Sequence, residues 1–225
     1  MMYKCLPITD IYAREIIDSR GNPTIEVEVL AGGEIIGKAS VAGKNYNKKE
    51  QTEKQQMDIE GKIELLNSQI APEIIGENVF EQRKIDTILK ENGNEQTSFA
   101  ISLAVARAAA AAEKIPLYRY LGGVRAVHPS MPQLVRKEEI EIEKIKEIKV
   151  DESTILTKLF ERILEEQNEG KKLLLSQETA GTEDNFLVDL AVAANITMIL
   201  VENRESAYYT VLNNRLLQLE EKIGG

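Results

Sequence analysis

The spacing of hydrophobic residues changes along this chain, and that change constrains the fold more than any single residue does. Between Thr24 and Leu30, apolar and acidic residues alternate, which predicts a strand with one buried face. Extended segments at 11–17 and 34–41 flank this strand, and turn-forming residues separate the three segments. Three strands joined by short turns predict an antiparallel meander.

From about Glu53 the apolar spacing becomes helical, and we expect this helix to end at Pro72. Asn78 resembles the N-cap of a second helix, and a longer Ala-rich helix is expected at 97–113. Another short helical turn and a Gly-Gly pair then close this part of the chain. Residues 1–124 are therefore predicted to form an α+β domain with three strands and about four helices.

Beyond residue 124 the composition changes, and we expect a charged linker with one amphipathic helix at 125–171. The segment 136–152 is rich in Glu, Lys and Ile, which fits a solvated strand or a frayed helix. Ser153 is placed to cap the helix that follows. An apolar stripe runs along that helix, made of Ile155, Leu156, Leu159, Phe160, Ile163 and Leu164. The stripe either packs within the chain or binds a partner, and the sequence leaves both open.

The final segment, 172–225, predicts a small β-α-β-α unit. We expect its strands at 172–176 and 196–201, each followed by a helix. Thr182, Glu183 and Asp184 precede the first of these helices. We interpret them as a helix cap that complements the helix dipole, in preference to an acidic site.

Composition argues against several classes of protein. The net charge of -9, with no stretch of Lys and Arg free of Glu, disfavours binding of nucleic acid. No apolar run is long enough for a membrane helix, and the first residues lack the apolar core of a signal peptide, so we expect a cytoplasmic protein. Cys5, the sole cysteine, cannot form an internal disulfide. His128, the sole histidine, has no ligand cluster around it in the sequence and is interpreted as a loop residue.

Several strings, in order, resemble the enolase family. They run from Tyr12 to Val29, Ala71 to Asp86, Ser102 to Ala110 and Ile115 to Gly123, and later from Glu178 to Ile196 and Asn213 to Gly224. Residues 125–172 resemble nothing recognised. A (β/α)₈ barrel typically needs roughly 200 residues or more. The resemblance therefore implies a shortened relative that keeps the N-terminal domain and a small α/β remnant, with most of the barrel missing.

The family resemblance implies phosphopyruvate hydratase, a magnesium-dependent lyase of glycolysis that interconverts 2-phosphoglycerate and phosphoenolpyruvate. No segment of this chain resembles the barrel motifs that carry the metal ligands and the catalytic base. Gly43 stands where the family has a magnesium-contacting serine, and Leu200 where it has a substrate-binding lysine. The family's Ser-His-Arg-Ser phosphate run aligns with a segment in which Gln177 replaces the histidine and Glu178 the arginine. An anion in place of that cation would repel a phosphoryl group.

The resemblance also implies a dimer, in which Arg14 and Glu26 would each pair with a charge in the last helix of the partner. The aligned partner positions are Tyr208 and Gln218, so each ion pair has lost one half. We therefore expect no enolase-type dimer. The chain is expected to be monomeric or to associate through the apolar stripe at Ile155, Leu159 and Ile163.

We thus expect a non-catalytic enolase-like protein with an interaction or regulatory role and an unidentified protein partner. It should bind no magnesium or other cofactor, and no pocket should gather two or more carboxylates with a lysine. Two alternatives remain. The chain is a hydratase only if another chain completes the barrel, or it is a decayed remnant without function.

Overall fold

The computed structural model describes residues 5–41, 53–92, 95–127, 129–141, 145–150, 155–177 and 181–224. Gly43, His128, Ser153 and Glu178 lie outside these ranges, so the predictions made for them stay predictions.

The predicted antiparallel meander is confirmed. Strands β1 (Ile8–Ile17), β2 (Pro23–Ala31) and β3 (Ile35–Ser40) pair in the order β1-β2-β3. Apolar side chains on one face of β2 are fully buried, whereas Glu28 on the other face is half-buried. This alternation produces a sheet with one face on the core and the other toward solvent.

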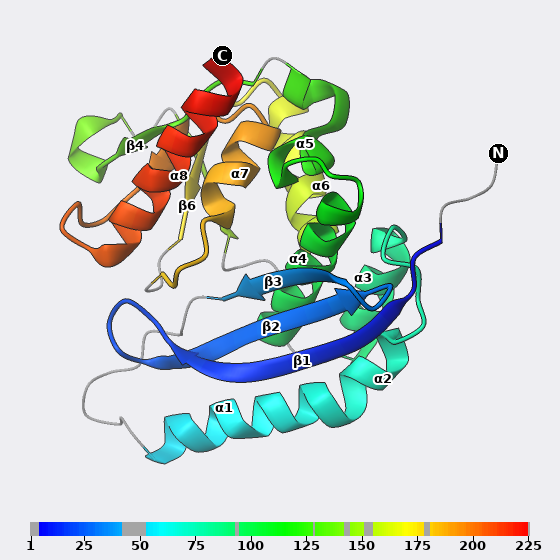
Figure 1. Ribbon diagram of the computed structural model, residues 1–225. Helices are drawn as coiled ribbons and strands as arrows, with labels where there is room; N and C mark the ends of the chain where they lie inside the picture. The colour runs from blue at the N-terminus through cyan, green and yellow to red at the C-terminus, as the bar shows by residue number, and fades with distance from the viewer. Residues whose placement is uncertain are drawn as a thin grey trace.

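Helices cover the buried face of this sheet (Figure 1). The helices of this half are α1 (Glu53–Leu65), the π-helical turn η1 (Leu66–Ile70), α2 (Ala71–Ile74), α3 (Gln82–Asn92), α4 (Glu95–Ala112) and α5 (Leu117–Gly122). The helices α1, α2 and α4 contact the strands, whereas α5 lies away from the sheet and packs against α7. The long Ala-rich helix α4 packs on β2 and β3. A Cβ atom at Gly37 of β3 would collide with the backbone of α4, so small residues set the close approach of helix and sheet.

Two helix boundaries differ from the sequence prediction. The first helix does not end at Pro72, because a π-helical turn precedes α2 and places the proline in its first turn, where its missing N–H is tolerated. Asn78 is not an N-cap, since α3 begins at Gln82. The Asn78 side chain instead accepts a hydrogen bond from the backbone N–H of Leu6, at 3.1 Å.

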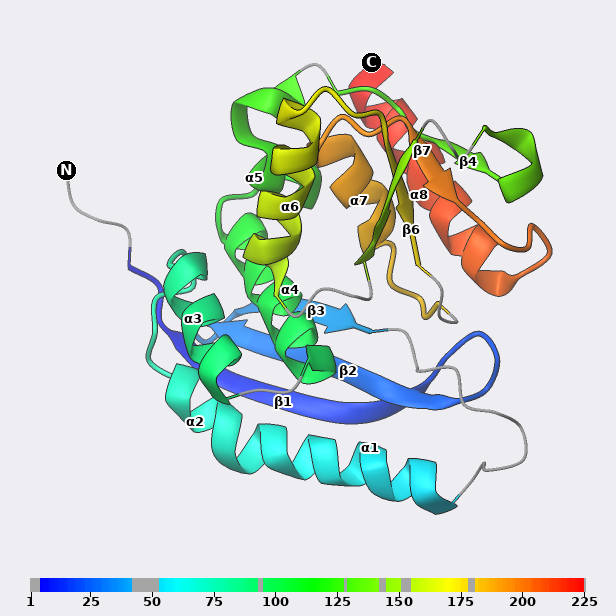
Figure 2. The same ribbon diagram turned by 180° about the vertical axis from the view of Figure 1, so that it is seen from behind.

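A second sheet occupies the other half of the molecule (Figure 2). Strands β4 (Gln133–Val135), β5 (Lys146–Lys149), β6 (Leu173–Ser176) and β7 (Met198–Leu200) are parallel, in the order β4-β7-β6-β5. The accompanying helices are α6 (Leu156–Asn168), α7 (Phe186–Ala193) and α8 (Ala207–Gly224), with short 3-10 turns η2 (Gly123–Val127) and η3 (Lys137–Glu139). The predicted α/β remnant at the C-terminal end is confirmed.

The segment 125–171 is more than the linker that we expected. It supplies β4 and β5, which form the two edges of the parallel sheet. Of the four residues of β5, Ile148 alone is fully buried, and the rest are charged and partly or fully exposed. A short strand with this composition has no clear hydrophobic period, which is why the sequence could not distinguish a solvated strand from a frayed helix.

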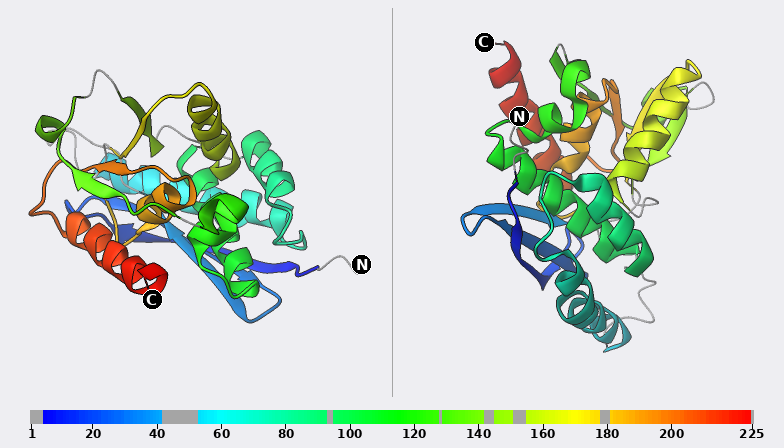
Figure 3. Two further views of the ribbon diagram at one scale, coloured as in Figure 1. Left: turned by 90° about the horizontal axis from the view of Figure 1, so that it is seen from above. Right: turned by 90° about the vertical axis from the view of Figure 1, so that its right-hand side faces the viewer.

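The apolar stripe of α6 packs within the chain, which answers the alternative left open above. Ile155, Leu159 and Ile163 are no more than 3% exposed and belong to one hydrophobic core that continues from the N-terminal helices. These residues offer no free surface to a partner. Figure 3 shows the two halves stacked, and α4 joins them, because it packs on β2 and β3 on one side and on α6 on the other.

Side chains of the N-terminal domain cap helix α6. The backbone N–H of Thr157 donates to Asp86 Oδ2 at 3.0 Å, and that of Leu156 donates to Ser102 Oγ at 3.0 Å. The Ser102 hydroxyl also donates to Asp86 at 2.6 Å, and the Asp86 residue is only 1% exposed. A different part of the chain therefore satisfies two of the free N–H groups in the first turn of α6.

Asp184 makes a second connection between the halves. Its carboxylate accepts two hydrogen bonds from Arg107 of α4, at 2.6 and 2.7 Å, and one from the backbone N–H of Ser40, at 3.0 Å. It also accepts a hydrogen bond from the N–H of Phe186, the first residue of α7, at 2.8 Å, although the N-cap position itself is Asn185. Burial lowers the pKa of Arg107, but the Asp184 charge and hydrogen bonds outweigh this, and the net pKa is raised.

We predict that Asp86→Ala lowers the free energy of unfolding by about 1 to 3 kcal/mol, because it removes the cap of α6 and leaves buried donors unpaired. Urea denaturation followed by circular dichroism measures this. The control is Glu91→Ala, an exposed position on the same helix, which should change stability by less than about 0.5 kcal/mol. Equal stability of the two variants would show that α6 does not depend on this cap.

Candidate functional site

Two pockets lie at the carboxyl ends of the parallel strands. Open parallel sheets typically bind their ligands at this edge, which makes these pockets the candidate site. A pocket of about 330 Å³ lies there, and its lining comes from η3, β5, β6 and β7: Lys137, Glu138, Glu147, Ser176, Gln177, Leu200, Val201 and Glu202.

A second pocket of about 270 Å³ adjoins the first and shares Gln177, Leu200, Val201 and Glu202 with it. The other residues of its wall come from the turn after β1 and from the start of α8: Ser19, Arg20, Gly181, Asn203, Ser206, Tyr208 and Tyr209. We call the two pockets together the carboxyl-edge groove. The N-terminal domain contributes Ser19 and Arg20 to this groove. The backbone N–H of Ser19 donates a hydrogen bond to the Gly181 carbonyl at 2.8 Å, which connects the two parts of the wall.

Among the described residues, the groove holds three carboxylates and one lysine, so our expectation that no pocket would gather two carboxylates with a lysine was wrong. Glu138, Glu147 and Glu202 come from three separate elements, and no spacing in the sequence connects them. Among the described residues, no three acidic, histidine or cysteine side chains lie close enough together to hold a metal ion. The groove is therefore acidic without forming a metal cluster within the described chain.

The three carboxylates differ in their partners. Glu138 lies 3.0 Å from Arg136, and Glu202 lies 3.3 Å from Arg20; both are exposed. Glu147 is half-buried and makes no ion pair with the residues that the structure describes. Glu147 sits in a run of similar Glu and Lys residues, so no local sequence pattern distinguishes it.

Ser176 and Gln177 lie at the end of β6. Ser176 is 2% exposed, and its hydroxyl oxygen has no hydrogen-bond partner among the described residues. The Gln177 side chain accepts a hydrogen bond from the Tyr208 hydroxyl at 3.1 Å. The Tyr208 ring in turn packs directly on Gly181, where any Cβ atom would collide with it. The position of Tyr208 in the second pocket therefore depends on its hydrogen bond to Gln177 and on the absence of a side chain at Gly181.

Leu200 and Gln177, which were singled out in the sequence, lie in the same groove. Leu200 is partly exposed at the end of β7, where it presents an apolar side chain instead of a cation. Glu178 follows Gln177 but lies outside the described residues. Two unit charges about 4 Å apart interact by about 4 kcal/mol at an effective dielectric near 20. Repulsion between the carboxylates of the groove and a phosphorylated acid therefore disfavours binding of such a ligand.

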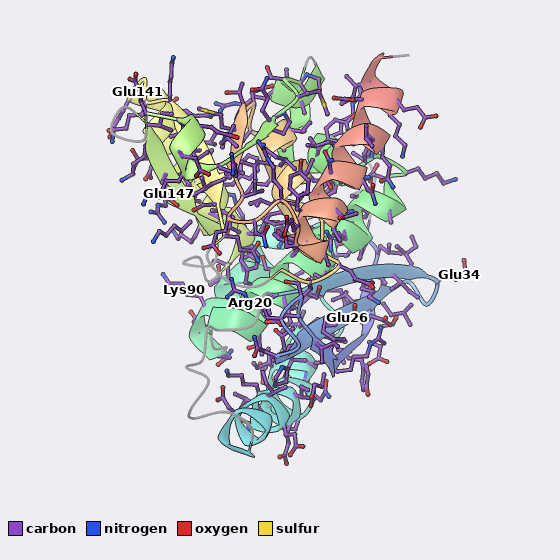
Figure 4. The ribbon with its side chains drawn as sticks, turned by 90° about the vertical axis from the view of Figure 1, so that its left-hand side faces the viewer. Arg20, Glu26, Glu34, Lys90, Glu141 and Glu147 are labelled. Atoms are coloured by element: carbon purple, nitrogen blue, oxygen red, sulfur yellow. The ribbon has the colours of Figure 1, made fainter. Side chains whose placement is uncertain are left out.

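The residues proposed for an interface lie elsewhere, on the outer face of the three-stranded sheet. Arg14 lies 2.5 Å from Glu26 and 2.7 Å from Glu28, and Lys38 lies 2.7 Å from Glu26. The side chain of Glu26 is only 10% exposed. Figure 4 shows Glu26 on this sheet and Glu147 on the parallel-sheet half. Arg14 and Glu26 therefore pair with each other within one chain.

The aligned partner positions are also accounted for within the chain. Tyr208 lies in the groove, and Gln218 of α8 accepts a hydrogen bond from Arg215 at 3.3 Å. Arg215 forms a paired ion bridge with the buried Asp189 of α7, at 2.6 and 2.9 Å.

A search of the described helices finds no candidate membrane span.

Comparison with known proteins gives a consistent result. A family model described as the enolase N-terminal domain matches residues 8–121. Similar curated proteins include the enolase of Methanocaldococcus jannaschii, 45% identical over 143 residues, which covers 56% of this chain and 34% of the relative. The enolases of Ehrlichia chaffeensis and Ehrlichia canis are 44% and 41% identical over 138 residues, covering 54% of this chain and 33% of each relative. The chain spans about a third of the length of these curated relatives.

Proposed function

The chain belongs to the enolase family, and we propose that it is a non-catalytic member with an interaction or regulatory role. The observation that carries this proposal is the composition of the carboxyl-edge groove. Carboxylates from η3, β5 and the end of β7 line it, and Leu200 lies where the family resemblance implies a substrate-binding lysine.

The charges of the groove residues also support the proposal. A substrate with a phosphoryl group and a carboxylate needs cations or metal ions to hold it. Of the described residues that line the first pocket, only Lys137 is a cation, and it is exposed to solvent, where its interaction is screened. Arg20 lines the second pocket but is already paired with Glu202. The groove therefore favours cations over phosphorylated anions.

The rival function is phosphopyruvate hydratase activity completed by another chain. Such a chain would have to supply the metal ligands, the base and enough positive charge to overcome the carboxylates already in the groove.

We also propose that magnesium is not a cofactor of this chain on its own.

We predict that the purified protein does not convert 2-phosphoglycerate to phosphoenolpyruvate at any magnesium concentration, because the groove repels the substrate and lacks a cation at Leu200. The ultraviolet absorbance of the enol product measures turnover. A matched preparation of Glu147→Gln separates this chain's activity from that of a contaminant. Turnover that stays constant per chain through purification and changes in Glu147→Gln would contradict the proposal.

We further propose that the chain does not form the dimer implied by the family resemblance. Arg14 and Glu26 pair with each other, their aligned partners are Tyr208 and Gln218, and the α6 stripe is buried. Exposed ion pairs contribute only about 0 to 1 kcal/mol each, so the pairs that remain would not hold a dimer together. A monomer presents the outer face of the three-stranded sheet, with Tyr12 and Ile36 exposed on it, as a surface for a different protein.

Sedimentation velocity of the wild-type protein should therefore give the mass of one chain at micromolar concentration. Arg14→Glu should leave that mass unchanged, as should Arg83→Glu, an exposed position on α3 that serves as the control. The proposal fails if the wild type is a dimer that Arg14→Glu dissociates and Arg83→Glu does not.

A further inference from the structure

The unpaired hydroxyl of Ser176 lies on the face of the parallel sheet that carries Glu147. Leu173 and Leu175 of β6 point into the hydrophobic core, so Ser176 points away from the core, because side chains alternate along a strand. Ser176 lies opposite Lys149 in the register with β5, and Glu147 is two residues earlier on the same face. Both Ser176 and Glu147 line the first pocket.

These two side chains leave an unusual set of hydrogen-bonding atoms without partners. The hydroxyl oxygen of Ser176 is buried and unbonded, and the half-buried carboxylate of Glu147 has no ion pair within the described chain. Buried polar groups are nearly always hydrogen-bonded, and leaving one unpaired costs about 1 to 3 kcal/mol. A ligand that donates to both oxygens would relieve that penalty.

An ammonium group fits this arrangement better than other common groups. It carries three N–H donors and one positive charge, so it can bond a hydroxyl and a carboxylate together. A phosphate or carboxylate would face Glu138, Glu147 and Glu202, and the described residues offer no cluster for a metal ion. The positive charge is therefore expected on an organic group.

The rest of the groove indicates how such a ligand continues. Leu200 lines both pockets with an apolar side chain, and Glu202 lies just beyond it on the same strand end. An alkyl chain against Leu200 would bring a second ammonium group toward Glu202, an exposed carboxylate that it would share with Arg20. We propose that the carboxyl-edge groove binds a small organic diamine, with one ammonium group held by Ser176 and Glu147 and the alkyl chain against Leu200.

Three probes with the same chain length and different charge test this proposal by nuclear magnetic resonance titration at low ionic strength. 1,4-Diaminobutane should shift the amide signals of Ser176, Gln177 and Leu200 saturably, and butane-1,4-diol and succinate should not. Added salt should weaken the diamine, because an ion pair contributes to its binding. The absence of saturable binding of the diamine, or equal binding of the diol, overturns the proposal.

Two variants and one control assign the site. Ser176→Ala removes a hydroxyl with no protein partner, so it should fold normally and weaken the diamine about fivefold. Glu147→Gln should weaken it about tenfold or more, since a bond to a charged group is lost. Glu165→Gln removes an exposed carboxylate outside the groove and should change affinity less than about twofold.

If both groove variants bind the diamine as tightly as the wild type, the attraction comes from the overall negative charge and the proposal is wrong. The diamine titration does not depend on turnover. A protein that binds no diamine can still be inactive on 2-phosphoglycerate, so the two proposals fail separately.

Discussion

The paired ion bridge between Arg107 and Asp184 positions the C-terminal half of this molecule on the N-terminal domain. Its side chains are only 19% and 8% exposed, and Asp184 also bonds the backbone of β3 and the first turn of α7. Removing one partner of a buried pair leaves a charge without compensation, which typically costs about 3 to 5 kcal/mol. The bridge therefore links the family's N-terminal sheet directly to the elements that form the groove.

The other connections act in the same direction. Asp86 and Ser102 cap α6, Ser19 bonds Gly181, and α5 packs on α7 closely enough that a Cβ at Gly122 would collide with Ala193. A single hydrophobic core runs through both halves. The short parallel sheet can thus remain ordered with four strands, because the N-terminal helices cover surface that would otherwise be exposed.

Strong periodic patterns made much of this fold predictable from sequence. The alternation in β2 and the Ala-rich stretch of α4 specify their own structures, and the strings near both ends indicated the family. The sequence left the β5 segment open between a solvated strand and a frayed helix, because a single fully buried residue, Ile148, gives no period. The helix past Pro72 was missed because a π-helical turn accommodates the proline. Leu200 was identified from its aligned position. Glu147 and Ser176 come together only through the register of β5 and β6, which no local pattern encodes.

We propose that the family fold persists here with a groove that rejects the family's anionic substrate. The most direct test is a titration of the isotope-labelled protein with 2-phosphoglycerate in excess magnesium, following the amide signals of Gln177 and Leu200. The account predicts no saturable shift of either signal. A saturable shift at both, competed by phosphoenolpyruvate, would contradict it.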